Sequence, residues 1–185
     1  MVCIIISISG TPGTGKTVVS KIIAKKLGTN LITVKNVIKK EKVPFKHDKE
    51  RKTKIIDIKD LNRAIAKNID KNKNNIIEGH LSHLIKSDIV IILRCNPEVL
   101  KKRLTKRKWN KRKINENILA EVLDSTTIEA LEIHSKKRIF EIDTSKKKVK
   151  DIVGIAMSII KKKNDYKDYR AGKIDWTEKY LRKTI

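Results

Sequence analysis

Residues 4–28, "IIISISGTPGTGKTVVSKIIAKKLG", combine an apolar run, a glycine-rich loop and an amphipathic segment, and this order predicts the class of fold. The stretch opens with a β-branched apolar run, which predicts a short strand buried on both faces. A loop with three glycines inside six residues follows, and Gly28 is placed to end the next segment in a left-handed conformation. That segment has helical spacing from Thr17, and its apolar side is expected to carry Val18, Ile22, Ile23 and Leu27.

The glycine-rich loop fits the pattern G-x-x-x-x-G-K-[ST], which ends on Lys16 and Thr17. Glycines let backbone N–H groups approach phosphate oxygens, and the start of a helix adds its positive dipole end. Lys16 can neutralise the β- and γ-phosphates, and the Thr17 hydroxyl can ligate Mg²⁺. No N-K-x-D guanine signature follows, which disfavours a GTPase and leaves a kinase and an ATPase open. The residues expected to bind the nucleotide are Gly10, Gly13, Thr14, Gly15, Lys16, Thr17 and Val18.

Strand-like and helix-like segments alternate along the rest of the chain. Strands are expected at residues 30–34, up to Glu78, at 88–95 and at 138–143. Helices are expected after Asp57 and Asn96, as one long helix from Asn115 past Leu131, and at 149–160. Residues 35–54 are mostly charged and are expected to form a mobile excursion with one short helix. The alternation predicts an α/β fold, with a five-stranded parallel sheet and helices on both faces.

The composition is that of one domain, residues 1–163, followed by a polar tail at 164–185 that is expected to lie over the surface. The formal net charge of +24 attracts polyanions and leaves nucleic acid open as a partner. Cys3 and Cys95 lie in apolar runs, so we expect buried thiols in a reducing, cytoplasmic compartment. The apolar start is too short to cross a membrane, and no membrane segment is expected.

Three stretches resemble adenylate-kinase-type P-loop kinases, and more narrowly the coilin-interacting nuclear ATPase and adenylate kinase family, which has archaeal members. The first is "SGTPGTGKT" at residues 9–17, and the second is "IIEGH" at 76–80, with Glu78 where the family usually has aspartate. The third is "KKRLTKRKWNKRKINENILAEV" at 101–122, which resembles the lid of the family. The resemblance covers residues 2 to about 160 and implies a P-loop NTPase fold with an acceptor-binding insertion, about 35–54, and a lid, about 106–113.

The resemblance also implies roles for single residues. Lys16, His80 and Arg107 would be catalytic: His80 by positioning the nucleophile or aiding hydrolysis, and Arg107 by closing over ATP. Glu78 would hold Mg²⁺ together with Thr17. The monophosphate would bind near Asp57 and Lys39, where the family usually has arginine; a lysine gives a point charge and not a bidentate fork. Simpler alternatives stay open: a strand-end acid for Glu78, a structural histidine for His80, and an ordinary N-cap for Asp57.

The expected activity is that of a nucleoside monophosphate kinase (ATP + AMP = 2 ADP) that uses Mg²⁺ and also hydrolyses ATP. Similar proteins assist maturation of the small ribosomal subunit, which implies a platform ribosomal protein and pre-ribosomal RNA as partners. Two alternatives remain. One is an assembly factor in which ATP hydrolysis is a switch and kinase turnover is incidental. The other is a small-metabolite kinase of the same fold.

Overall fold

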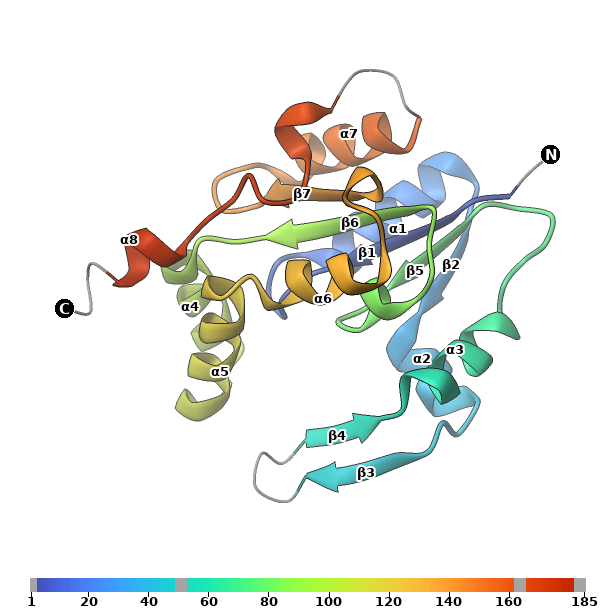
Figure 1. The fold of residues 1–185 in the computed structure, drawn as a ribbon, viewed down its shortest axis with the longest axis horizontal. Coiled ribbons are helices and arrows are strands. Elements are labelled where there is room, and N and C mark those ends of the chain that lie inside the picture. The colour runs from blue at the N-terminus through green and yellow to red at the C-terminus, as the bar shows by residue number, and fades with distance from the viewer. Residues whose placement is uncertain (1–2, 49–52, 162–165, 182–185) are drawn as a thin grey trace.

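The structure, a computed structural model, describes residues 3–48, 53–161 and 166–181. A five-stranded sheet forms its centre, with every pair of neighbouring strands parallel and the order β2-β5-β1-β6-β7 (Figure 1). Its strands are β1 (Ile5–Ser9), β2 (Asn30–Thr33), β5 (Asn75–Glu78), β6 (Ile89–Arg94) and β7 (Ile139–Asp143). The predicted five-stranded parallel sheet is confirmed.

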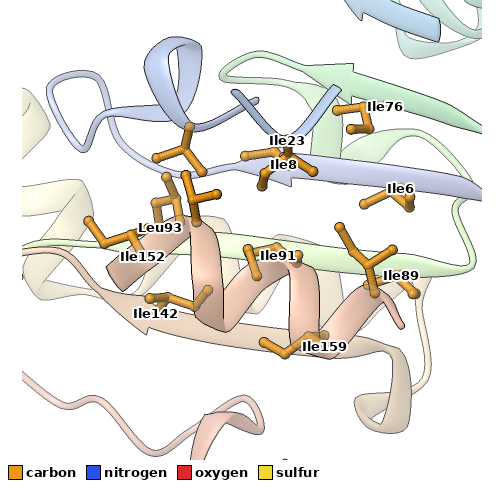
Figure 2. Close-up of a cluster of buried hydrophobic side chains, with 14 of the residues drawn as sticks. Ile6, Ile8, Ile23, Ile76, Ile89, Ile91, Leu93, Ile142, Ile152 and Ile159 are labelled. Atoms are coloured by element: carbon orange, nitrogen blue, oxygen red, sulfur yellow. The ribbon is translucent and has the colours of Figure 1, made fainter. Parts of the chain in front are cut away.

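Helices cover both faces of this sheet, as predicted. On one face α1 (Lys16–Leu27) and α7 (Val149–Ile160) pack over β1, β6 and β7 in the largest hydrophobic cluster, part of which Figure 2 shows. On the other face Ala130 of α6 (Ser125–Ile133) packs with Val90, Ile92 and Ile139. Strand β6 is buried along its whole length, so its carboxyl end and that of β1 are held rigidly side by side.

The first half of the fold carries a small unit beside the main sheet. Helices α2 (Val34–Lys40) and α3 (Ile58–Ala66) flank an antiparallel pair, β3 (Phe45–Asp48) and β4 (Thr53–Ile56), which projects away from the sheet in Figure 1. The predicted short helix in residues 35–54 is confirmed, whereas the hairpin was not predicted; residues 49–52 lie outside the described residues. Strand β3 is largely exposed and therefore has no apolar alternation from which to predict it.

The predicted long helix from Asn115 past Leu131 is wrong, because the chain forms two helices there. Helix α5 (Lys111–Val122) begins where Asn110 accepts a hydrogen bond from the Lys113 N–H (2.8 Å), and α6 follows a break at Asp124, which has a left-handed φ of 53°. Residues 106–113 accordingly comprise the end of α4 (Pro97–Lys106), a turn and the first turn of α5. Three leucines of the stretch that was predicted as one helix, Leu119, Leu123 and Leu131, are exposed.

Two smaller predictions also need correction. In α1 Val18 is exposed and its neighbour Val19 is buried, so the apolar side is rotated by one residue from the expected one. Residues 166–181 of the polar tail pack on the domain: Arg170 forms a β-bridge with Phe140, Ala171 is buried, and α8 (Thr177–Leu181) follows. Cys95 is buried, Cys3 is half-buried, and both thiols are free. Within residues 3–48, 53–161 and 166–181, no helix has the length and apolarity needed to cross a membrane.

Candidate active site

The glycine-rich loop joins β1 to α1 at the carboxyl edge of the sheet, and its glycines are required sterically. Gly10 has a φ of 131°, and a Cβ there would lie 2.3 Å from the Leu93 carbonyl oxygen of β6. Gly13 has a φ of 98°, and a Cβ would lie 2.9 Å from Leu100 Cδ1. The loop therefore packs tightly on β6 and α4 and reaches Gly15, the N-cap of α1, in a left-handed conformation. A bare backbone at the start of a helix is the arrangement that binds phosphate.

The side chain of Lys16 is buried beneath this loop, and its ammonium group donates hydrogen bonds to carbonyl oxygens of the loop. Nζ donates to the carbonyl oxygens of Gly10 (2.7 Å) and Thr11 (3.1 Å). Burial lowers the pKa of Lys16 from 10.5 to about 8; the carboxylates of Glu78 and Glu121 oppose this, and the positive charge of Arg107 adds to it. Lys16 is thus held at the loop, and a polyanion bound there would stabilise its protonated, charged form.

Thr17 and Glu78 meet next to the loop. The Thr17 hydroxyl donates to Glu78 Oε1 (3.0 Å), and Glu78 is buried at the end of β5, paired with Ile8 of β1. A hydroxyl and a carboxylate are the hard oxygen donors that suit Mg²⁺, which takes its remaining ligands from phosphates and water. In the part of the chain that the structure describes, no group of three or more His, Cys, Asp or Glu side chains could hold a metal. The two oxygens therefore fit a metal that arrives with a nucleotide.

His80 lies beside Gly10 as well. Its ring makes a hydrogen bond with the backbone of Gly10, the residue whose oxygen also accepts from Lys16, and the residue is exposed at the surface. Partial burial, then the charge of Lys16, lower the pKa of His80, so the imidazole is neutral near pH 7. A neutral, partly accessible imidazole beside a phosphate loop can accept a proton from a nucleophile.

The remaining predicted residues lie farther from the loop. Arg107 caps the end of α4 with an exposed side chain, close enough for its charge to act on Lys16. Lys39 is exposed in the last turn of α2. Asp57 is the N-cap of α3 and accepts from the Lys59 N–H (2.7 Å). The structure thus brings Lys16, Thr17, Glu78 and His80 together, and it leaves Lys39 and Asp57 on the α2–α3 unit.

Sequence reasoning missed the polar residues that support the loop. His83 is fully buried, contacts Ser9 Oγ through Nδ1 (2.8 Å) and contacts Glu129 through Nε2 (2.7 Å). His83 therefore anchors Ser9, the last residue before the loop. Glu121 is also buried and bonds to Thr11. The sequence signal for Glu121 was the arginine that ends the apolar strand β6, since a buried cation requires buried carboxylates.

Fold and loop together define a P-loop nucleotide-binding domain, and comparisons with known proteins agree. The family model described as "AAA domain" matches residues 6–124, which is more than half of the chain. "Putative adenylate kinase" of Methanocaldococcus jannaschii is 41% identical over 176 residues, covering 95% of this chain and 94% of that protein. The protein of the same name from Archaeoglobus fulgidus is 39% identical over 173 residues, covering 93% and 91%.

Solved structures show the same fold at low identity. Shikimate kinase from Acinetobacter baumannii superimposes with a TM-score of 0.60 at 15% identity, covering 88% of this chain and 96% of that one. Thymidylate kinase from Candida albicans gives a TM-score of 0.53 at 14% identity, covering 87% and 92%. The chain belongs to the family of the archaeal proteins above, which are P-loop kinases of the adenylate kinase type, and it is therefore a phosphotransferase.

Proposed function

We propose that the protein is a nucleoside monophosphate kinase that transfers the γ-phosphoryl group of ATP to AMP and forms two ADP. The observation that carries the proposal is Lys16, buried on the Gly10 and Thr11 carbonyls with its pKa lowered to about 8. Such a charge gains most from a polyphosphate that replaces the carbonyls. The archaeal relatives are named for adenylate kinase activity, which supports AMP as the acceptor.

In this proposal an oxygen of the AMP phosphate attacks the γ-phosphorus, and the bond from that phosphorus to the β–γ bridging oxygen breaks. The electron pair of the broken bond stays on the ADP that leaves. Lys16 and the loop N–H groups stabilise the charge on the transferring group and the leaving oxygen. Thr17 and Glu78 would hold the Mg²⁺ of MgATP, which neutralises phosphate charge when it is bound. Arg107, from the α4–α5 turn acting as the lid, would add a further positive charge.

ATP hydrolysis is the same transfer with water as the acceptor, and we assign His80 to it. Its neutral imidazole beside Gly10 can orient the water and take its proton. On the acceptor side we propose that Lys39 of α2 binds the AMP phosphate and that Asp57 lies at the acceptor site. Residues 35–54 would form the segment that closes over AMP. Asp57 also serves as the N-cap of α3, so this is the least specific of the assignments.

We further propose that the protein acts in the cytoplasm during maturation of the small ribosomal subunit, as the narrower resemblance to the coilin-interacting nuclear ATPase family implies. The formal net charge of +24 supports it, because such a charge favours pre-ribosomal RNA and the surfaces of ribosomal proteins. Co-sedimentation with small subunits at low and moderate salt tests this role. If the protein does not co-sediment with small subunits even at low salt, the ribosomal role is refuted, and the kinase proposal is unaffected.

The kinase proposal is tested by ATP consumption measured alone and with AMP, CMP, GMP and UMP in turn. We expect AMP to accelerate ATP loss, with two ADP formed for each ATP consumed, whereas hydrolysis forms only one. A rate that no monophosphate changes would support the ATPase-switch alternative instead. Inactivity toward all nucleotides, with ATP still bound, would favour a small-metabolite acceptor.

A further inference from the structure

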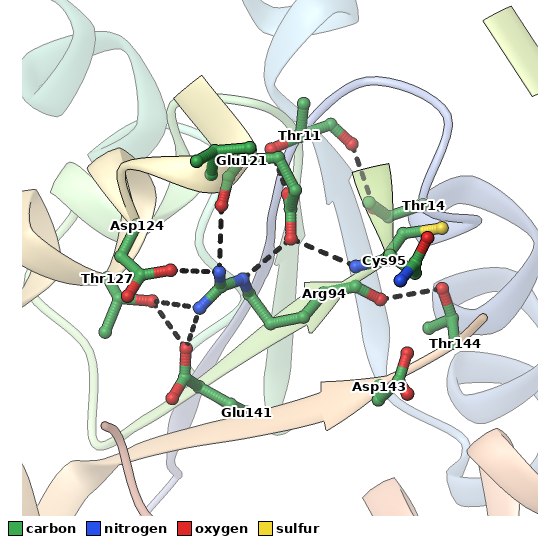
Figure 3. A network of polar contacts seen from close by, with 12 residues as sticks. Thr11, Thr14, Arg94, Cys95, Glu121, Asp124, Thr127, Glu141, Asp143 and Thr144 are labelled. Atoms are coloured by element: carbon green, nitrogen blue, oxygen red, sulfur yellow. Dashed lines mark hydrogen bonds and ion pairs between the residues drawn. The ribbon is translucent and has the colours of Figure 1, made fainter. Parts of the chain in front are cut away.

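A buried ion network stands behind the phosphate loop, centred on Arg94 (Figure 3). Arg94 ends β6 with a fully buried side chain. Its Nε donates to Glu121 Oε1 (2.7 Å), and its other nitrogens donate to the Glu121 carbonyl (3.0 Å) and to the carboxylates of Asp124 and Glu141. A buried guanidinium is tolerated only when its donors are satisfied in this way. The network therefore fixes the end of β6 against α5 and β7.

Glu121 does more than neutralise Arg94. Its Oε1 also accepts from the Cys95 N–H (3.0 Å), and its Oε2 accepts from the Thr11 hydroxyl. One carboxylate thus joins three parts of the fold: the end of β6, the last turn of α5 and the second residue of the phosphate loop. The Thr11 bond is the member of the network that reaches the loop (Figure 3).

Thr11 passes this restraint to the functional lysine. Its carbonyl oxygen accepts from the Thr14 hydroxyl (2.9 Å) and from Lys16 Nζ (3.1 Å). Thr11 and Thr14 are buried, as is Glu121, so no solvent competes for these bonds. Moving Thr11 would move the oxygen on which Lys16 rests.

We propose that Glu121 is a positioning residue for phosphoryl transfer: through Thr11 it holds the loop and Lys16 in register with helix α5, which carries the second half of the lid. The inference rests on the proposed kinase function. The lid and the phosphate loop are coupled because a displacement of α5 near its end at Val122 would move Glu121, and the hydrogen bond of Glu121 would displace Thr11.

The test separates positioning from stability by cutting the network at two places. Thr11→Val removes only the bond to the loop and leaves the Arg94–Glu121 pair intact. Thr127→Val is the matched control: the Thr127 hydroxyl donates to Glu141 (2.7 Å) and accepts from Arg94, on the side away from the loop. Thr11→Ser keeps the hydroxyl. We expect both valine variants to melt at lower temperature, because each leaves a buried charged partner short of a bond.

The readouts are kcat for AMP phosphorylation and the affinity for a fluorescent ATP analogue. We expect Thr11→Val to lower kcat by about tenfold or more, the worth of a hydrogen bond to a charged group. The kcat of Thr127→Val should stay within about twofold of wild type, because the Thr127 hydroxyl contacts Glu141 and Arg94 and not the loop. Thr11→Ser should restore most of the kcat that Thr11→Val loses. Equal losses in Thr11→Val and Thr127→Val, or no recovery in Thr11→Ser, would overturn the inference.

If wild type phosphorylates no monophosphate, the proposed kinase function fails. The positioning inference is then judged on ATP affinity, and a Thr11→Val protein with wild-type affinity would end it.

Discussion

Lys16 should titrate near pH 8 in the nucleotide-free protein and regain its proton when ATP binds. The side chain is 8% exposed, and burial lowers its pKa from 10.5 to about 8. That difference corresponds to about 3 kcal/mol between the two protonation states. A triphosphate beside Nζ favours the charged form, so binding above pH 8 requires uptake of one proton.

The size of the effect follows from the titration. At pH 7 about nine-tenths of Lys16 is protonated, and at pH 9 about one-tenth, so the Kd for ATP should rise roughly tenfold across this window. ATP itself loses its last phosphate proton near pH 6, about one unit below this pH window, so its own titration contributes little to the change. Calorimetry in two buffers with different ionisation enthalpies measures both the Kd and the proton uptake. In Lys16→Met affinity should be low at every pH, with no phosphoryl transfer.

The same titration governs stability. Because the folded-state pKa lies below the unfolded value, the folded protein releases the Lys16 proton first, between pH 8 and 10.5. The unfolded state then holds more protons, so folding gains stability as pH rises through this window, relative to Lys16→Met. An ATP affinity that stays flat between pH 7 and 9, with no proton uptake, would refute the reasoning about Lys16.

The remaining predictions concern His80, the two flanking segments and His83. His80→Ala should reduce ATP hydrolysis on the order of a hundredfold with ATP binding intact, whereas Lys86→Ala, an exposed change six residues on, should match wild type; equal hydrolysis in both would make His80 structural. A bisubstrate analogue should raise hydrogen-exchange protection in α2 and in the α4–α5 turn but not in α7, and unchanged exchange in both would count against closure. Burial lowers the pKa of His83 below 6.5, so the stability it contributes is present above pH 6.5 and is lost as pH falls below it. Urea unfolding at pH 7.5 and 5 should show this loss in wild type and less of it in His83→Ala; the same loss in both would exclude His83 as its source.

Much of the fold and of the loop could be predicted because the signals are local. Strand, glycine loop and helix are contiguous in the first 28 residues, and caps such as Asn96 and Asp57 bond within their own turn (Glu98 N–H to Asn96, 3.0 Å). Glu78 and His80 were implied by the resemblance of "IIEGH" to the family, and Glu78 reaches the loop because parallel strands end at one edge of the sheet.

What could not be predicted depends on tertiary contacts. The break at Asp124 follows from its bond to Arg94, thirty positions away, and no helical periodicity in residues 115–131 reports it. The supports of the loop have the same origin: Glu121 is 110 positions from Thr11, and His83 is 74 from Ser9. Their sequence spacing does not indicate these contacts. Arg94 at the end of an apolar strand indicates that a buried carboxylate is needed, but only the structure identifies Glu121 as its partner.

The most direct test of the central claim follows the γ-phosphate itself. With enzyme in excess over ATP labelled at the γ-phosphorus, and with AMP present, the label should move to the β-position of newly formed ADP in a single turnover, with little inorganic phosphate. Omitting AMP should leave only slow release of inorganic phosphate. Label released as inorganic phosphate at one rate, with or without AMP, would contradict the account of this protein as a nucleoside monophosphate kinase.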